Sequence, residues 1–310
     1  MSVDAIREIF EKLETCEAWR LLLLQIKQKT AGDNVYSSRQ IIISPQGGLK
    51  RFVGEIQEEY LDEKKGLILR YEDIREYDGT GIQSSVYRIS KEHYMIDSDC
   101  KAFEKCIANA KVDALLSGFD PCASVITGDI KSDGHKTQVI LISMKKPVTT
   151  LKHKFLCYDG TYSEIKGKVL NLRTSIDAII YDNYVYLLSM DGERLFSLER
   201  SYKKISAQRT TEVINEDMVS DKDTFKRIAE SGYNPRRFLS FNPERFDMLK
   251  DRGAIEKMKK IFSITTVDGR FDTSSPENAE KLIKILCNKG MTDPFTDNPV
   301  EVEGAKKWYQ

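Results

Sequence analysis

The sequence is poor in the residues on which metal, redox and His-based chemistry depend. Its 310 residues include three His and six Cys, and no two Cys form a CxxC pair. Zinc sites and thiol redox centres use clustered Cys and His, so this composition disfavours both. We predict no catalytic residue, metal ligand or cofactor. The scattered thiols favour a chain that resides in the reducing cytoplasm.

Long apolar runs are lacking as well. The run LLLL at residues 21–24 falls far short of the roughly 20 apolar residues that a membrane-spanning helix needs. The first residues also lack the cationic and then apolar pattern of a secretory signal. We therefore expect neither a membrane span nor a signal peptide. Apolar residues still make up 40% of the chain, enough for real cores, and the length predicts two domains.

Net charge is zero, but the balance conceals an asymmetry along the chain. Residues 1–130 hold 17 Lys and Arg against 22 Asp and Glu, residues 131–210 hold 14 against 8, and residues 211–310 hold 17 against 18. The basic middle favours an anionic partner. A solvated surface with unevenly distributed charge would give the same pattern.

The spacing of apolar residues predicts an α+β chain with domains at residues 1–150 and 151–310. The first domain is expected to mix strands with helices. Helical spacing marks residues 3–14, 49–60 and 101–116. Strands are predicted at residues 19–26, 41–43, 67–71, 85–89 and 138–144.

The second domain is predicted to begin with a small antiparallel sheet and to continue as a helical C-terminal region. Asp-Asn and Asp-Gly pairs punctuate its short apolar segments, as in hairpins. Strands are expected at residues 155–158, 165–172, 176–181, 184–189 and 193–197. Helices are expected near residues 198–207, 224–230, 255–262 and 276–288, and a terminal strand near residue 300.

One part of the sequence partly matches the catalytic motif of restriction-type nucleases. Restriction-type nucleases hold a metal ion between an Asp and the Glu of an E-x-K strand. Asp129 precedes a strand that ends at Lys145 and Lys146, but Ser143 stands where the Glu is needed. We expect a protein that is not an enzyme, with a metal-dependent nuclease as the alternative.

Basic side chains with interleaved aromatic residues gather in the middle of the chain. Arg200, Lys203 and Lys204 are spaced i, i+3, i+4 and share one face of a predicted helix. Such cations can contact a phosphate backbone, with Tyr158 and Tyr162 available for stacking. A solvated face paired with nearby carboxylates is the ordinary explanation. The candidate DNA-binding residues are Lys145, Lys146, Lys152, Lys154, Lys166, Lys168, Arg173, Arg200, Lys203, Lys204 and Arg209.

Three segments of the second half resemble the Kiwa protein B family of bacterial anti-phage defence. They are SIDAIIYDNYVYLLS at 175–189, FSLERSY at 196–202 and DPFTDNPVEV at 293–302. The resemblance implies a cytosolic component that binds DNA without sequence preference and works with a small integral-membrane partner. It supplies no catalytic residue. The neutral overall charge departs from a dedicated DNA binder, so a local patch or an oligomer must concentrate positive charge.

Together these patterns give one functional hypothesis and two alternatives. We expect an anti-phage effector that binds DNA through a basic surface and forms a homodimer or larger homo-oligomer. It would be cytoplasmic and recruited to the inner membrane by its partner. The alternatives are a metal-dependent nuclease and a scaffold that binds only protein.

Overall fold

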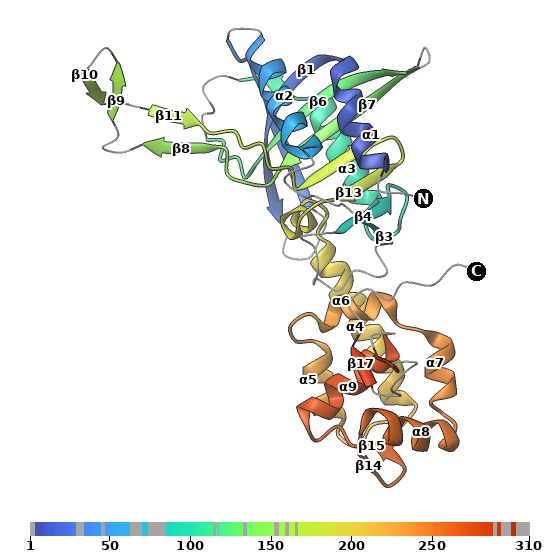
Figure 1. Ribbon diagram of the computed structural model, residues 1–310. Coiled ribbons are helices and arrows are strands. Elements are labelled where there is room, and N and C mark those ends of the chain that lie inside the picture. Colours follow the sequence, from blue (N-terminus) through green and yellow to red (C-terminus); the bar gives the residue numbers. More distant parts are fainter. Residues whose placement is uncertain are drawn as a thin grey trace. The chain divides into compact units, whose positions relative to one another are not determined.

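The computed structural model of the chain is shown in Figure 1. It describes residues 4–28, 34–44, 47–62, 70–73, 85–113, 116, 118–132, 135–151, 155–158, 161–164, 167–287, 290–292 and 299–301. The chain forms two compact units, each described by itself. The sheet unit comprises Met1–Tyr71 and Gln83–Ser197, and the helical unit comprises Glu72–Ile82 and Leu198–Gln310. The predicted α+β class with a helical C-terminal region is confirmed.

A nine-stranded sheet organises the sheet unit. Its strand order is β3-β4-β13-β12-β7-β6-β1-β2-β5, and the β2–β5 pair is parallel while the other described pairs are antiparallel. The strands are β1 (Cys16–Gln28), β2 (Asn34–Ile41), β3 (Arg70–Asp73), β4 (Ser85–Ser90), β5 (Lys111–Val112), β6 (Ala123–Ser132), β7 (His135–Ser143), β12 (Ala178–Tyr181) and β13 (Tyr184–Leu187).

The predicted hairpin of the second domain lies inside this sheet. β12 pairs with β7, and β13 pairs with β4, so both strands have first-half neighbours. The boundary predicted at residue 150 therefore falls within the sheet unit, and the contacts divide the chain at Ser197 instead. The third strand predicted at residues 193–197 is wrong, because Met190–Phe196 forms a 3-10 helix.

Both faces of the sheet are covered at β1, so this strand is buried on both sides. Residues 21–24 of β1 are four consecutive leucines with no exposed surface, as expected of a central strand. Helices α1 (Asp4–Lys12) and α2 (Gly47–Leu61) pack with Leu21 and its neighbours in one core. Helix α3 (Asp97–Ala108) contacts β2 and ends earlier than the 101–116 predicted, because the chain turns into β5.

Two short pairs of strands and a helical core complete the described chain. β8 (Val148–Leu151) pairs with β11 (Gly167–Leu170), and β9 (Phe155–Tyr158) pairs with β10 (Thr161–Glu164). The helical unit comprises α4 (Leu198–Asn215), α5 (Lys222–Ala229), α6 (Asn234–Arg237), α7 (Pro243–Met248), α8 (Arg252–Phe262) and α9 (Pro276–Leu286), with the pairs β14 (Thr266–Val267)–β15 (Arg270–Phe271) and β16 (Gly290–Thr292)–β17 (Pro299–Glu301). Among the described helices, none has the length and apolar character needed to cross a bilayer.

Candidate nucleic-acid interface and a cavity at the sheet edge

Helix α4 presents the strongest of the predicted basic clusters. One side of the helix is buried along a stripe that includes Leu198, Tyr202 and Ser206. The other side carries three exposed cations at i, i+3 and i+4, namely Arg200, Lys203 and Lys204. We call these three residues the α4 patch. The sequence placed them on one face, and the structure exposes that face to solvent.

One cation of the α4 patch, Lys203, is paired with a neighbouring carboxylate on the same helix. Lys203 Nζ lies 2.8 Å from Glu199 Oε1, and the hydrogen bond from Lys203 lowers the pKa of Glu199. Both side chains are about two-thirds exposed, so this pair contributes little to stability. Lys204 makes no ion pair with any described residue. All three cations of the patch stay exposed, so an external anion can reach them.

Arg209, on the same helix, is held by the fold. Its guanidinium donates to Glu212 at 2.7 Å and lies over the Phe241 ring at 5.0 Å from the centroid. It is also half-buried. A cation stacked on an aromatic ring and paired with a carboxylate has an ordinary packing role, so we leave Arg209 out of the patch.

A second set of predicted cations lies beyond the end of β7, in the sheet unit. Lys145 donates to Asp191 at 2.5 Å, and Lys146 lies 2.7 Å from Asp120. The hydrogen bond to Asp191 raises the pKa of Lys145, while the nearby charge of Arg173 opposes that rise. Arg173 is exposed and makes no ion pair within the described chain. Two of these three cations are thus occupied by carboxylates.

The remaining predicted residues lie outside what the structure describes. Lys152, Lys154 and Lys166 are outside the described residues, and for Lys168 only the backbone in β11 is described. The structure also divides the predicted set between two units that are described separately. It places the β7 cations in the sheet unit and the α4 patch in the helical unit.

The nuclease pair weighed from the sequence does not assemble. Asp129 of β6 lies opposite Gln138 near the start of β7, whereas Lys145 follows the far end of that strand. Five strand steps, or about 17 Å at 3.3 Å per residue, separate Gln138 from the end of β7 at Ser143, and Lys145 lies two residues further along the chain. Asp129 and Lys145 therefore cannot belong to one metal-dependent nuclease site. Within the described chain, no three His, Cys, Asp or Glu side chains gather closely enough to hold a metal ion.

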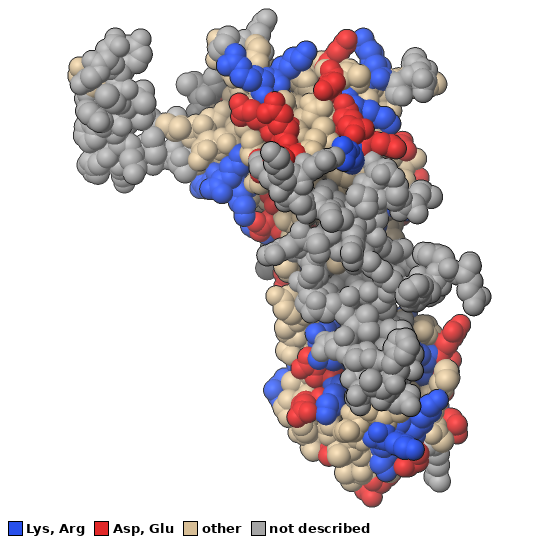
Figure 2. Space-filling model, viewed as in Figure 1, with Lys and Arg blue, Asp and Glu red and all other residues tan. Residues whose placement is uncertain are grey.

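Sequence reasoning missed a second basic surface on the helical unit. Figure 2 shows Lys and Arg side chains gathered around α8. Lys257 and Lys260 are exposed and make no ion pair among the described residues, while Lys259 lies 3.1 Å from Glu256. The signal was present as KMKK at residues 257–260, but the near-neutral charge of residues 211–310 concealed it.

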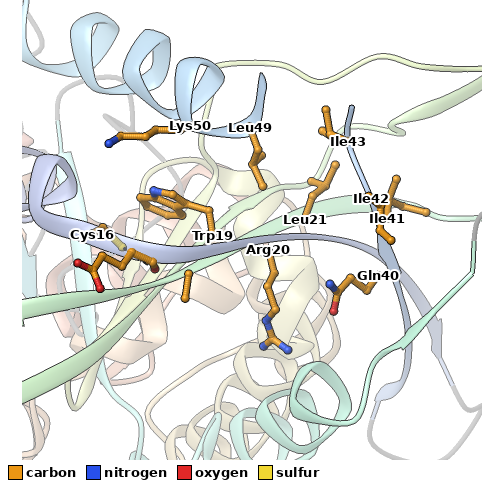
Figure 3. Close-up of a pocket in the computed structure, with 12 residues that line it drawn as sticks. Cys16, Trp19, Arg20, Leu21, Gln40, Ile41, Ile42, Ile43, Leu49 and Lys50 are labelled. Carbon is orange, nitrogen blue, oxygen red and sulfur yellow. Dashed lines mark hydrogen bonds between the residues drawn. The ribbon is translucent and has the colours of Figure 1, made fainter. Parts of the chain in front are cut away.

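Sequence reasoning also missed a cavity of about 450 Å³ at the edge of β1 (Figure 3). Strand β2 pairs with β1 only from Leu21↔Ile41 onward, so residues 16–20 of β1 lack β2 as a neighbour. The cavity occupies that place. Its walls come from β1, the end of β2 and the first turn of α2: Cys16, Glu17, Ala18, Trp19, Arg20, Leu21, Gln40, Ile41, Ile42, Ile43, Leu49 and Lys50.

A β-bulge aims Trp19 at this cavity. Glu17 pairs with Asp129 and Arg20 with Thr127, so Ala18 and Trp19 together oppose the single residue Gly128. Ala18 has φ +55°, a left-handed conformation that costs a non-glycine residue about 1 kcal/mol. The indole packs against the α1–α2 core on the same side as Leu49 and Lys50, while Arg20 and Gln40 point to the other side of the strand (Figure 3).

The cavity is bordered by more positive than negative charge. Lys50 and Arg20 line it and make no ion pair within the described residues. Glu17, the lining carboxylate, is engaged by Lys131 at 2.7 Å, and that hydrogen bond lowers the pKa of Glu17. Burial raises the pKa of Cys16 to about 12, so its thiol stays protonated and unreactive at neutral pH.

Comparison with known proteins finds a family match in the second half of the chain. The model of the Kiwa protein KwaB-like family matches residues 135–296, just over half of the sequence. The match begins at β7 and includes β12, β13 and the helices of the helical unit, and therefore the α4 patch. The cavity at β1 lies outside it. No curated protein and no solved structure gives a significant match.

Proposed function

The chain belongs to the Kiwa protein KwaB-like family, and from that premise we propose that it acts in Kiwa anti-phage defence by binding DNA through the α4 patch. The family connects the chain to the defence system. DNA binding is our proposal, and it is supported above all by three exposed cations on one helical face inside the family match.

The physical basis of the proposal is the charge density of the DNA backbone. Duplex DNA carries one negative charge per about 1.7 Å of helix axis, so cations that reach phosphates displace condensed counterions. Arg200, Lys203 and Lys204 span little more than one helical turn, and their flexible side chains can reach neighbouring phosphates. Contacts of this kind hold the duplex without reading its sequence. Occupied DNA would then be blocked from use by the phage.

We further propose that the chain works in a complex, as a homo-oligomer recruited by a small integral-membrane component of the system. A chain with zero net charge gains DNA affinity when several copies present their patches to one duplex. Co-expression with the membrane component, followed by membrane flotation, tests the recruitment. A chain that stays at the bottom of the gradient with the component present would contradict it.

The DNA proposal is tested by charge reversal on α4. We expect Lys203→Glu with Lys204→Glu to lower affinity for duplex DNA at least tenfold. The slope of log affinity against log salt should also fall in magnitude by about 2, because two phosphate contacts are lost. The measurement is fluorescence anisotropy with a labelled duplex at several salt concentrations.

A matched control separates the patch from overall charge. Lys226→Glu with Arg227→Glu makes the same charge change on α5, at exposed positions of the same unit. We expect this variant to bind DNA nearly as wild type does. Equal losses in both double variants would refute the α4 patch, and unchanged binding in the α4 variant would do the same. DNA cut in the presence of Mg²⁺ would favour the nuclease alternative.

A further inference from the structure

The cavity at β1 is built from features that a plain strand edge does not need. A regular strand could continue from Cys16 to Leu21 without a left-handed residue. Instead Ala18 adopts φ +55° and the bulge inserts one extra residue opposite Gly128. Such bulges re-aim a side chain, and backbone strain of this kind persists where its surroundings or a function maintain it. Here the re-aimed side chain is Trp19.

Gly128 leaves the space in which the indole of Trp19 packs. A methyl group at this position would lie 2.6 Å from Trp19 Cε3 and 2.5 Å from Cys16 Sγ. The absence of a side chain at residue 128 therefore allows the ring to lie close to the strand. The indole is only partly buried, so part of it remains as a wall of the cavity. Its position is fixed by backbone and glycine rather than by a flexible loop.

The size and lining of the cavity suit one aromatic anion. A volume of about 450 Å³ falls in the range of small-molecule sites, roughly 300–1,000 Å³, and excludes a duplex. Trp19 offers an aromatic wall, and Ile42, whose surface is 72% exposed, offers a second apolar wall at the rim. A planar ring can stack on such a wall.

The charges favour a phosphate beside that ring. Lys50 lies on the Trp19 side of β1 and has no carboxylate within ion-pair distance among the described residues (Figure 3). Glu17 is paired with Lys131, at 2.7 Å; the charge of Lys50 also lowers the pKa of Glu17, but by less than Lys131 does and without an ion-pair contact. Hydrogen-bonding groups for a base edge are also present, since β2 leaves the backbone of β1 unpaired on this side before Leu21.

We propose that this cavity binds a free nucleotide, with its base against Trp19 and its phosphate at Lys50. The proposal concerns binding alone. The Cys16 thiol in the wall is protonated at neutral pH, and no covalent step is involved. The site lies in the sheet unit and outside the family match, so it does not depend on duplex binding by the α4 patch.

Trp19 supplies its own reporter. The chain has two tryptophans, Trp19 and Trp308, so the full-length Trp308→Phe protein leaves Trp19 as the single indole. We expect the nucleoside monophosphates of adenine, guanine, cytosine and thymine to quench its fluorescence saturably. At least one of them should do so at submillimolar concentration. Inorganic phosphate alone should cause no quenching, because it has no ring to stack.

Variants identify the two contacts. Lys50→Gln should weaken nucleotide binding roughly tenfold, the effect of losing one charge-assisted hydrogen bond. Trp19→Leu, followed by calorimetry, should weaken it by a similar factor. Lys105→Gln removes an exposed lysine of α3 outside the cavity and should change nothing. The α4 double variant should also bind nucleotide as wild type does, while Lys50→Gln should leave duplex binding intact.

Several outcomes would overturn the proposal. The first is the absence of both quenching and heat with every monophosphate at millimolar concentration. The second is equal affinity in wild type and Lys50→Gln. Binding of a single-stranded oligonucleotide without binding of free monophosphates would assign the site to unpaired nucleotides of a strand and refute a free ligand. Binding of inorganic phosphate as tight as that of nucleotide would reduce the site to an anion site.

Discussion

At position 128 a single methyl group decides whether two neighbouring side chains fit. The Cβ of an alanine would come within 2.5 Å of Cys16 Sγ and 2.6 Å of the Trp19 ring. Both contacts are closer than van der Waals distance, and Cys16 is buried in the α1–α2 core. The ring and the thiol must therefore move, and a packed core resists such movement. Glycine at this position follows from the bulge of β1.

We expect Gly128→Ala to destabilise the protein by about 1–3 kcal/mol, the usual cost of overpacking. Urea unfolding followed by Trp fluorescence measures the change. Ala18→Gly is the matched control on the facing strand: at φ +55° glycine relieves strain while it adds unfolded-state entropy. Its stability should stay within about 0.5 kcal/mol of wild type. A Gly128→Ala protein as stable as wild type would contradict the close packing of Trp19 against residue 128.

Asp177 shows what a family signature can encode. It belongs to the segment 175–189, which suggested the family from sequence alone. In the structure its buried carboxylate accepts hydrogen bonds from the Met144 amide, at 2.7 Å, and from the Ser189 hydroxyl. Its carbonyl accepts from the amides of Leu188 and Ser189. The signature therefore encodes the closure of the β12–β13 hairpin onto β7, a structural role that its sequence pattern did not reveal.

At the scale of elements, the cap at the N-terminus of α5 makes the stability of the fold depend on pH. Asp221 caps this helix by accepting the Thr224 amide at 2.9 Å and the Thr224 hydroxyl at 2.9 Å. These hydrogen bonds lower the pKa of Asp221 below its ordinary 3.8. Because the folded pKa lies below the unfolded one, this stabilisation is complete above about pH 5 and is lost as pH falls through 3.8 and below.

Asp221→Asn should therefore flatten the acid limb of the stability curve. Asparagine caps a helix about as well as aspartate, but it does not titrate. Urea midpoints of the variant and wild type should agree near pH 6 and diverge near pH 3, because only the wild type loses its ionised cap as the pH falls. Asp223→Asn, on the first turn of the same helix, is the control. A variant with the full acid sensitivity of wild type would contradict this linkage.

The spacing of apolar residues predicted the elements that have one continuous apolar face. It failed where contacts with residues far away in the sequence determine the local structure. The helices at α1, α2 and α9 and the strands at β1, β4 and β7 follow their apolar spacing. The strand expected at residues 193–197 became a 3-10 helix, whose carbonyls at Arg194 and Leu195 accept from Asn34, at 3.3 and 3.1 Å. Tyr36 also donates to Leu195, at 2.6 Å. Those partners lie about 160 residues away, beyond any window of local sequence.

The two candidate sites differ in the same way: local sequence predicts one of them, and the other depends on distant contacts. The α4 patch was predictable because positions i, i+3 and i+4 share a helical face whatever the rest of the chain does. The cavity was not, because it needs the departure of β2, the bulge of β1 and the start of α2 in one place. Trp19 alone gave no signal, since a tryptophan on an apolar strand is ordinarily a core residue.

At the scale of the whole molecule, the position of the hairpin decides where the chain can be divided. β12 and β13 occupy the middle of the sheet order, between β7 and β4. A fragment of residues 1–150 would lose both, so β4 would lose its neighbour β13 and β7 would become an open edge. That edge contains Val139 and Leu141, whose side chains are buried in the complete sheet. Apolar strand edges of this kind promote aggregation.

A fragment of residues 1–197 retains all nine strands and should behave differently. We expect it to be soluble, with a strand-rich circular dichroism spectrum and a cooperative urea transition. The 1–150 fragment should be insoluble or should unfold without cooperativity, because part of its core is missing. Size-exclusion chromatography and urea titration of both fragments make the comparison. A monomeric, cooperatively folded 1–150 fragment would restore the boundary predicted from the sequence, because the first half would then close its sheet without the hairpin.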